Sequence, residues 1–75
     1  MLVVNDLNFR KIKKEFHEVI FLQDNQEVYR INGLVKSEIK KIKRWYGEYE
    51  ITGFEFKTEY ETTPYPIYKL YIKIK

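Results

Sequence analysis

A stretch of basic and apolar residues near the start of the chain recurs thirty positions later, and this recurrence limits how the chain can fold. Residues 9–21 overlie residues 39–51, with apolar positions over apolar ones and basic over basic. The apolar matches are 9/39, 12/42, 16/46, 19/49 and 21/51, and the basic matches are 10/40, 11/41, 13/43 and 14/44. Each copy predicts a helix that feeds a strand. Bias of the composition toward Lys and Ile is the rival explanation of the match.

The apolar residues at the start of each copy have helical spacing, at intervals of three and four. The first helical face consists of Phe9, Ile12 and Phe16, and the second of Val35, Ile39, Ile42 and Tyr46. Asn5 or Asp6 and then Ser37 are the expected N-caps, because their side chains can accept hydrogen bonds from free first-turn amides. Gly47 is the expected end of the second helix.

The apolar period changes to two at His17, which predicts strands. Residues 24–26 form the expected turn of a first hairpin, in which Val19 faces Ile31 and Phe21 faces Tyr29.

A second hairpin is expected over residues 48–61 and 67–75. The alternation changes parity at Gly53, which predicts a β-bulge there. The register that best satisfies both faces puts Phe54 opposite Ile74 and Phe56 opposite Ile72 on the core side. The same register puts Glu55 opposite Lys73 and Glu59 opposite Lys69.

These elements predict an α+β fold in a single domain over residues 1–75. Two αββ units, residues 9–32 and 39–75, would place both helices on one face of a largely antiparallel sheet. If Met1–Val4 adds an edge strand, the order begins βαββαβ, as in ferredoxin-like folds, with one further strand after it.

The length of 75 residues makes the domain small, and it has no cysteine for a disulfide or a thiolate metal site. Homodimerisation is therefore the expected supplement to its core. No apolar run approaches the roughly 20 residues of a membrane span, and Met1–Val4 is too short for a signal peptide. We expect a cytoplasmic protein with no membrane partner.

Positive charge is concentrated on the two expected helices. Residues 9–16 carry four cations and one carboxylate, and residues 36–46 carry five cations and one carboxylate, whereas the whole chain has a net charge of +3. The candidate binding residues are Arg10, Lys11, Lys14, Lys36, Lys40, Lys41, Lys43 and Arg44. If the helices are neighbours, such a surface predicts binding to nucleic acid or to an acidic protein surface. The alternative is a solvated face with no partner.

The first hairpin is apolar on its second side too, at Ile20, Leu22 and Val28, and Trp45 lies on the shoulder of the second helix. These four residues are the candidate dimer or partner interface. In the alternative interpretation, Leu2–Val4 cover the hairpin. The C-terminal strand is a further candidate if it forms an unpaired edge.

Enzymatic activity is the least expected function. His17 is the only histidine and Ser37 the only serine, and no glycine-rich phosphate loop is present. We therefore predict no catalytic, cofactor-binding or metal-binding residue, and a non-enzymatic module that binds nucleic acid.

The alternative function is an inhibitor from a virus or mobile element that blocks a host protein, of the anti-CRISPR or other antidefence type. Residues with AT-rich codons (Lys, Ile, Asn, Tyr and Phe) make up 36 of the 75 positions, and alanine is absent. In that case the protein would act in the cytoplasm of the host cell.

Overall fold

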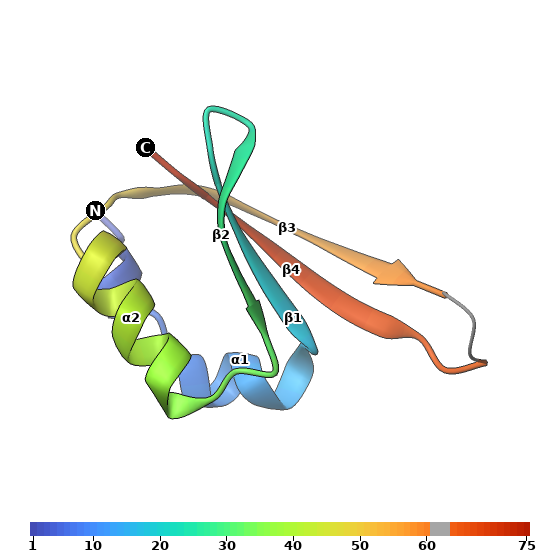
Figure 1. Ribbon diagram of the computed structural model, residues 1–75. Coiled ribbons are helices and arrows are strands. Elements are labelled where there is room, and N and C mark those ends of the chain that lie inside the picture. Colours follow the sequence, from blue (N-terminus) through green and yellow to red (C-terminus); the bar gives the residue numbers. More distant parts are fainter. Residues whose placement is uncertain (61–63) are drawn as a thin grey trace.

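A computed structural model describes residues 1–60 and 64–75, and it is an α+β structure of two helices on a four-stranded sheet (Figure 1). A short 3₁₀ helix precedes them. In chain order the elements are η1 (Val4–Asp6), α1 (Phe9–Glu15), β1 (Glu18–Gln23), β2 (Gln26–Asn32), α2 (Lys36–Tyr46), β3 (Ile51–Glu59) and β4 (Ile67–Ile74). In the described ranges no helix is long and apolar enough to cross a membrane.

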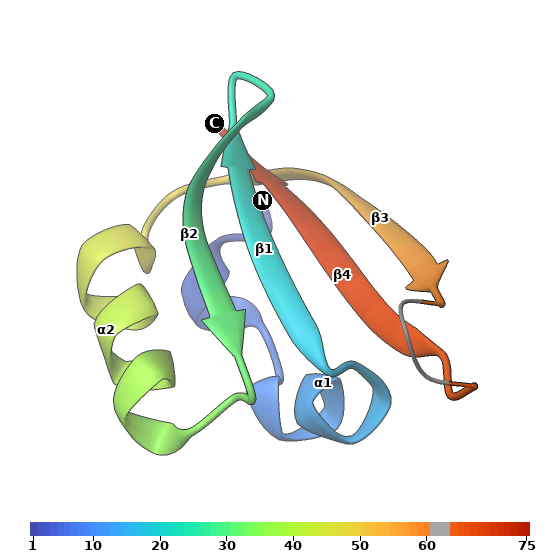
Figure 2. The same cartoon turned by 45° about the vertical axis from the view of Figure 1, so that its right-hand side comes forward.

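The sheet has the strand order β2-β1-β4-β3 (Figure 2). The β1–β2 and β3–β4 pairs are antiparallel, but the central pair, β1 and β4, is parallel. The sheet is therefore mixed, whereas the sequence predicted a largely antiparallel one. In β4, Leu70, Ile72 and Ile74 are all buried, and an apolar strand of this kind is stabilised most at the centre of a sheet.

Both helices lie on one face of the sheet, as predicted (Figure 1). Their apolar stripes pack on one buried cluster, to which β1 contributes Val19 and Phe21 and β2 contributes Ile31. The predicted hairpin register is confirmed, since Val19 pairs with Ile31 and Phe21 pairs with Tyr29.

The order helix–strand–strand occurs twice, but the two units occupy different positions in the sheet. In the first unit the strand after the helix, β1, is central, whereas in the second the corresponding strand, β3, forms an edge. The helices also differ in length, because α1 has 7 residues and α2 has 11. The recurrence at thirty positions therefore extends to the element order and not to a symmetric arrangement.

The N-terminal segment does not add a strand of the kind that a ferredoxin-like order needs. Val3 makes one isolated bridge to Glu50, and the chain then turns into η1, where the carboxylate of Asp6 accepts a hydrogen bond from the Val3 amide (2.9 Å). The Val4 side chain is buried in the helix-side cluster, so the N-terminus covers that side and not the second face of the first hairpin.

The predicted bulge is present, because the β3–β4 register shifts between Ile51 and Gly53. Beyond it, the observed register differs from the predicted one by two residues, and Phe54 pairs with Ile72 and Phe56 with Leu70. The prediction that these two phenylalanines enter the core is wrong, because their side chains are 51% and 74% exposed. The far part of the hairpin extends past the helices in Figure 2, whereas Ile51 at the start of β3 still packs on the core.

The second helix ends at Gly47 as predicted, but the N-caps of both helices differ from the predicted ones. Asn8 caps α1, because its side-chain oxygen accepts a hydrogen bond from the Lys11 amide. Val35 precedes α2, so Ser37 lies inside that helix. Gly47 follows α2 in a right-handed conformation. Its lack of a side chain matters because a Cβ there would lie 2.5 Å from the Asn5 Oδ1 atom.

Candidate nucleic-acid interface

One flank of α2 is held against β2 by a polar and aromatic contact. The Tyr29 hydroxyl donates to Oε2 of Glu38 (2.5 Å), and the Trp45 ring meets the Tyr29 ring edge-on at 5.8 Å. This hydrogen bond raises the pKa of Tyr29 to about 12 and lowers the pKa of Glu38 below its ordinary value. Lys41 Nζ lies 3.6 Å from Glu38 Oε1, so Lys41 belongs to this flank.

The opposite flank of α2 meets α1 in a cleft lined by cations. A cavity of about 180 Å³ lies between the helices. Its walls carry Arg10 and Lys13 from α1 and Lys36 from the start of α2. Its apolar lining consists of Phe9, Leu34 and Ile39.

A fourth cation reaches the same region from the middle of α2. Lys43 Nζ lies 5.6 Å from the centroid of the Phe9 ring, in a cation–π contact. Because Phe9 also lines the cavity, Lys43 extends the positive surface along the seam between the two helices. We name Arg10, Lys13, Lys36 and Lys43 the cleft cations.

Almost all the helix cations lack a carboxylate partner among the residues that the structure describes. Lys41 is the exception, through Glu38. The unpaired cations are Arg10, Lys11, Lys13, Lys14, Lys36, Lys40, Lys43 and Arg44. Because no described carboxylate contacts them, these side chains are open to an external anion.

Two cations on the open face of the sheet, Arg30 and Lys69, are in contrast paired with carboxylates. Arg30 lies 2.5 Å from Glu18 and 2.7 Å from Glu27, and Lys69 lies 3.6 Å from Glu18 and 2.8 Å from Glu59. This network crosses all four strands, and only 8% of Lys69 is exposed. Arg30 and Lys69 are thus neutralised by carboxylates, unlike most of the helix cations.

The structure changes which predicted residues adjoin one another. Sequence reasoning expected Arg10, Lys11 and Lys14 beside Lys40, Lys41 and Arg44 and did not select Lys13. Instead, Lys13 lines the cleft with Arg10 and Lys36, whereas Lys11, Lys14, Lys40 and Arg44 are exposed and line neither cavity. Lys13 lies one helical turn after Arg10, so the two side chains are neighbours on the flank of the apolar stripe. This spacing is the sequence signal for a pair of cations beside the groove.

The candidate interface residues are distributed over both faces. Ile20 is completely buried, Leu22 and Val28 are half-buried, and Trp45 is 56% exposed but contacts Tyr29. Ile20 pairs with Arg30 and Tyr71 across the sheet. Its burial without a covering element indicates that the long side chains of the open face shield it from water.

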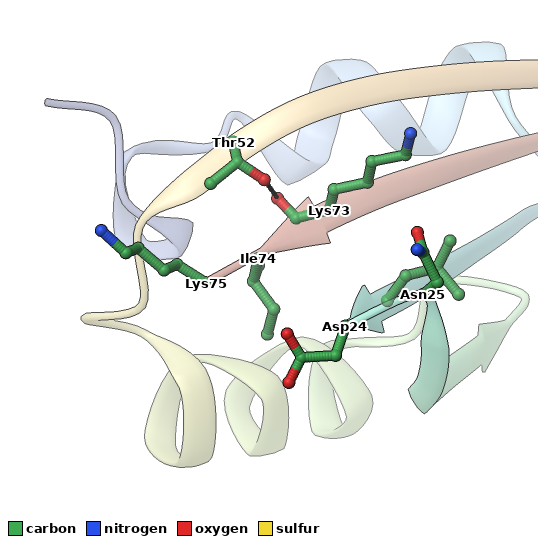
Figure 3. A pocket seen from close by; sticks show the side chains of 7 residues that line it. Asp24, Asn25, Thr52, Lys73, Ile74 and Lys75 are labelled. Atoms are coloured by element: carbon green, nitrogen blue, oxygen red, sulfur yellow. Dashed lines mark hydrogen bonds between the residues drawn. The ribbon is translucent and has the colours of Figure 1, made fainter.

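A second cavity, of about 250 Å³, lies at the far end of the sheet by the β1–β2 turn (Figure 3). It is lined by residues of both charges, including Asp24, Lys73 and Lys75. Figure 3 shows the amino groups of Lys73 and Lys75 directed away from Asp24 and from each other. These two amino groups therefore do not converge on a single ligand atom.

His17 has a structural contact at the start of β1. The Tyr68 amide donates to its Nδ1 atom (3.0 Å), its own amide donates to the Tyr68 carbonyl (2.9 Å), and the two rings stack at 5.7 Å. Residues 1–60 and 64–75 contain no cluster of three or more histidine, aspartate or glutamate side chains suited to a metal ion.

Comparison of the chain with family models, with curated proteins and with solved structures finds no match.

Proposed function

We propose that the chain is a non-enzymatic module that binds nucleic acid, and that the cleft cations hold phosphates of the backbone. The convergence of Arg10, Lys13 and Lys36 on one cavity, without a carboxylate among the described residues that line it, carries this proposal. A phosphate there would receive charge-assisted hydrogen bonds from the guanidinium and ammonium groups.

The position of the cleft adds to this support. It includes the first residue of α2, where the helix dipole favours negative charge. The unpaired cations outside the cleft, Lys11, Lys14, Lys40 and Arg44, would extend the positive field along both helices. A strand of linked phosphates matches such an extended surface better than one small anion does.

The proposal is tested by measuring the affinity for single-stranded and duplex DNA and RNA over a series of salt concentrations. We expect binding at low salt. The logarithm of the affinity should fall linearly with the logarithm of the salt concentration, because each phosphate contact releases a counterion. Failure to bind any of these polymers at low salt would refute the proposal.

A pair of matched variants locates the site. The double variant Arg10→Gln and Lys13→Gln removes two cleft cations, whereas Lys73→Gln and Lys75→Gln removes the same charge from the far end of the sheet. We expect the cleft variant alone to lose affinity at least tenfold. The slope of its log affinity against log salt concentration should be shallower by about one to two. Equal losses in the two variants would mean that only net charge matters and would contradict a site in the cleft.

A further inference from the structure

The strand β3 forms an uncovered edge of the sheet. In Figures 1 and 2 no described helix or strand lies beyond it, and the N-terminal segment pairs only with its start, where the Ile51 amide donates to the Leu2 carbonyl (2.8 Å). The opposite edge strand, β2, is flanked by α2 through the contacts of Tyr29 with Glu38 and Trp45. An edge strand has a row of backbone amides and carbonyls that its own sheet does not pair. At Ile51–Glu59, this edge is the longest strand of the structure.

The helix side of the same strand exposes two aromatic rings. Phe54 and Phe56 are 51% and 74% exposed, although the residues they pair with, Ile72 and Leu70, are buried. Neighbouring exposed phenylalanines on an unpaired edge are costly in water and typical of a contact surface.

The open side of β3 has alternating charge, in the order Glu55, Lys57 and Glu59. If Phe56 faces Phe56 of a second, antiparallel copy, then Glu55 faces Lys57 of that copy, and the pair occurs twice. Centring the contact on Glu55 or on Lys57 instead brings like charges together. The Phe56-centred register keeps residues 53–59 paired, and within β3 it combines this overlap with opposite charges across the interface.

We propose that two copies of the chain associate by antiparallel pairing of their β3 strands, with Phe56 on the twofold axis. The two four-stranded sheets then form one continuous sheet, and Phe54 and Phe56 of both copies make an apolar row on its helix side. Glu55 is 4.0 Å from Lys73, and Lys57 is 5.2 Å from the Tyr71 ring; both contacts lie on the open face and are compatible with the pairing.

The association has a geometric consequence that the single chain does not have. A twofold axis perpendicular to the sheet keeps the helices of both copies, and so both α1–α2 clefts, on the same side of the dimer. The pairing itself depends on β3 alone, and its test below contains no nucleic acid.

The mass in solution, measured by light scattering and sedimentation over a range of concentrations, gives the first test. We expect the native chain to be a dimer. The variants Glu55→Lys and Lys57→Glu should each be monomeric, because like charges would then face each other at two places in the interface. Mixing these two variants restores opposite charges at both positions, so a heterodimer is expected. A monomeric native chain, dimeric single variants or a monomeric mixture would each overturn the proposal.

A cross-linking experiment tests the register, because the chain contains no cysteine of its own. Phe56→Cys brings two sulfurs together at the axis, so mild oxidation is expected to give a covalent dimer. Thr52→Cys is the control, since its two copies would lie on the order of 25 Å apart at the strand rise of about 3.3 Å per residue. Circular dichroism checks that both variants fold. Cross-linking of Thr52→Cys as readily as of Phe56→Cys would exclude this register.

Discussion

The Nζ atom of Lys69 lies 2.8 Å from Oε2 of Glu59, although the β3 residue directly opposite Lys69 is Lys57. The ion pair is thus diagonal, and it relieves the repulsion of two lysines that the strand register brings together. It also lowers the pKa of Glu59 below its ordinary value, mainly through the hydrogen bond from Lys69.

The Glu59 pair predicts an acid-sensitive component of stability. Because the pKa of Glu59 is lower in the folded chain than in the unfolded chain, its contribution is complete above the unfolded value of 4.5 and is lost as the pH falls below it. Glu59→Gln should therefore lose less stability than the native chain between neutral pH and pH 3. Urea unfolding midpoints over this range measure the difference, and identical pH profiles would contradict it.

Glu18 should be the most important carboxylate of the open face, because both Arg30 and Lys69 contact it. Its removal leaves the nearly buried Lys69 with less compensation. We expect Glu18→Gln to lower the free energy of unfolding by about 1–3 kcal/mol. Glu27→Gln is the control, since this exposed residue contacts only Arg30 and should cost at most about 0.5 kcal/mol. Equal losses on urea unfolding would indicate that burial of Lys69 is unimportant.

Gly47 should tolerate no larger residue. In Gly47→Ala, the new Cβ would overlap the side chain of Asn5 and the carbonyl of Lys43, so unfolding should become easier by about 1–3 kcal/mol. Gly53→Ala is the matched control, because its Cβ would meet only Lys73 Cδ at 3.7 Å. Thermal and urea unfolding compare the two, and a loss for Gly53→Ala as large as that for Gly47→Ala would count against the steric explanation.

The Tyr29–Glu38 hydrogen bond predicts an effect at high pH. The pKa of Tyr29 is about 12 in the folded chain and has the ordinary value of 10.0 in the unfolded chain, so the stabilisation is complete below pH 10 and is lost between about pH 10 and 12. Tyr29→Phe should lack this loss and the corresponding late phenolate absorbance. Spectrophotometric titration of both proteins measures it, and an unchanged late step in Tyr29→Phe would assign that step to another tyrosine.

The sequence was sufficient for the features that depend on local pattern. The two helices, the register of Val19 with Ile31 and the bulge at Gly53 were all predictable, because each follows from apolar spacing or a parity change. The parallel pairing of β1 with β4 was not, since it depends on which strand of the second hairpin docks against the first.

The candidate site was predictable only in part, for a related reason. Helical periodicity identifies which cations point away from the core, but it does not give the angle at which α1 and α2 meet. That angle brings Lys13 and Lys36 to one cavity and leaves Lys11 outside it. The exposure of Phe56 was missed because an alternating strand does not reveal how far the helices extend over it.

The parallel β1–β4 pair also constrains the order of folding. His17 and Tyr68 are 51 positions apart in the chain, yet they are bonded through backbone and ring at the start of this pair. During synthesis, β1 would have only β2 beside it until residues 67–74 leave the ribosome. Contacts of such long sequence separation slow folding. We therefore expect the nascent chain to complete its core only after residues 67–74 have been translated.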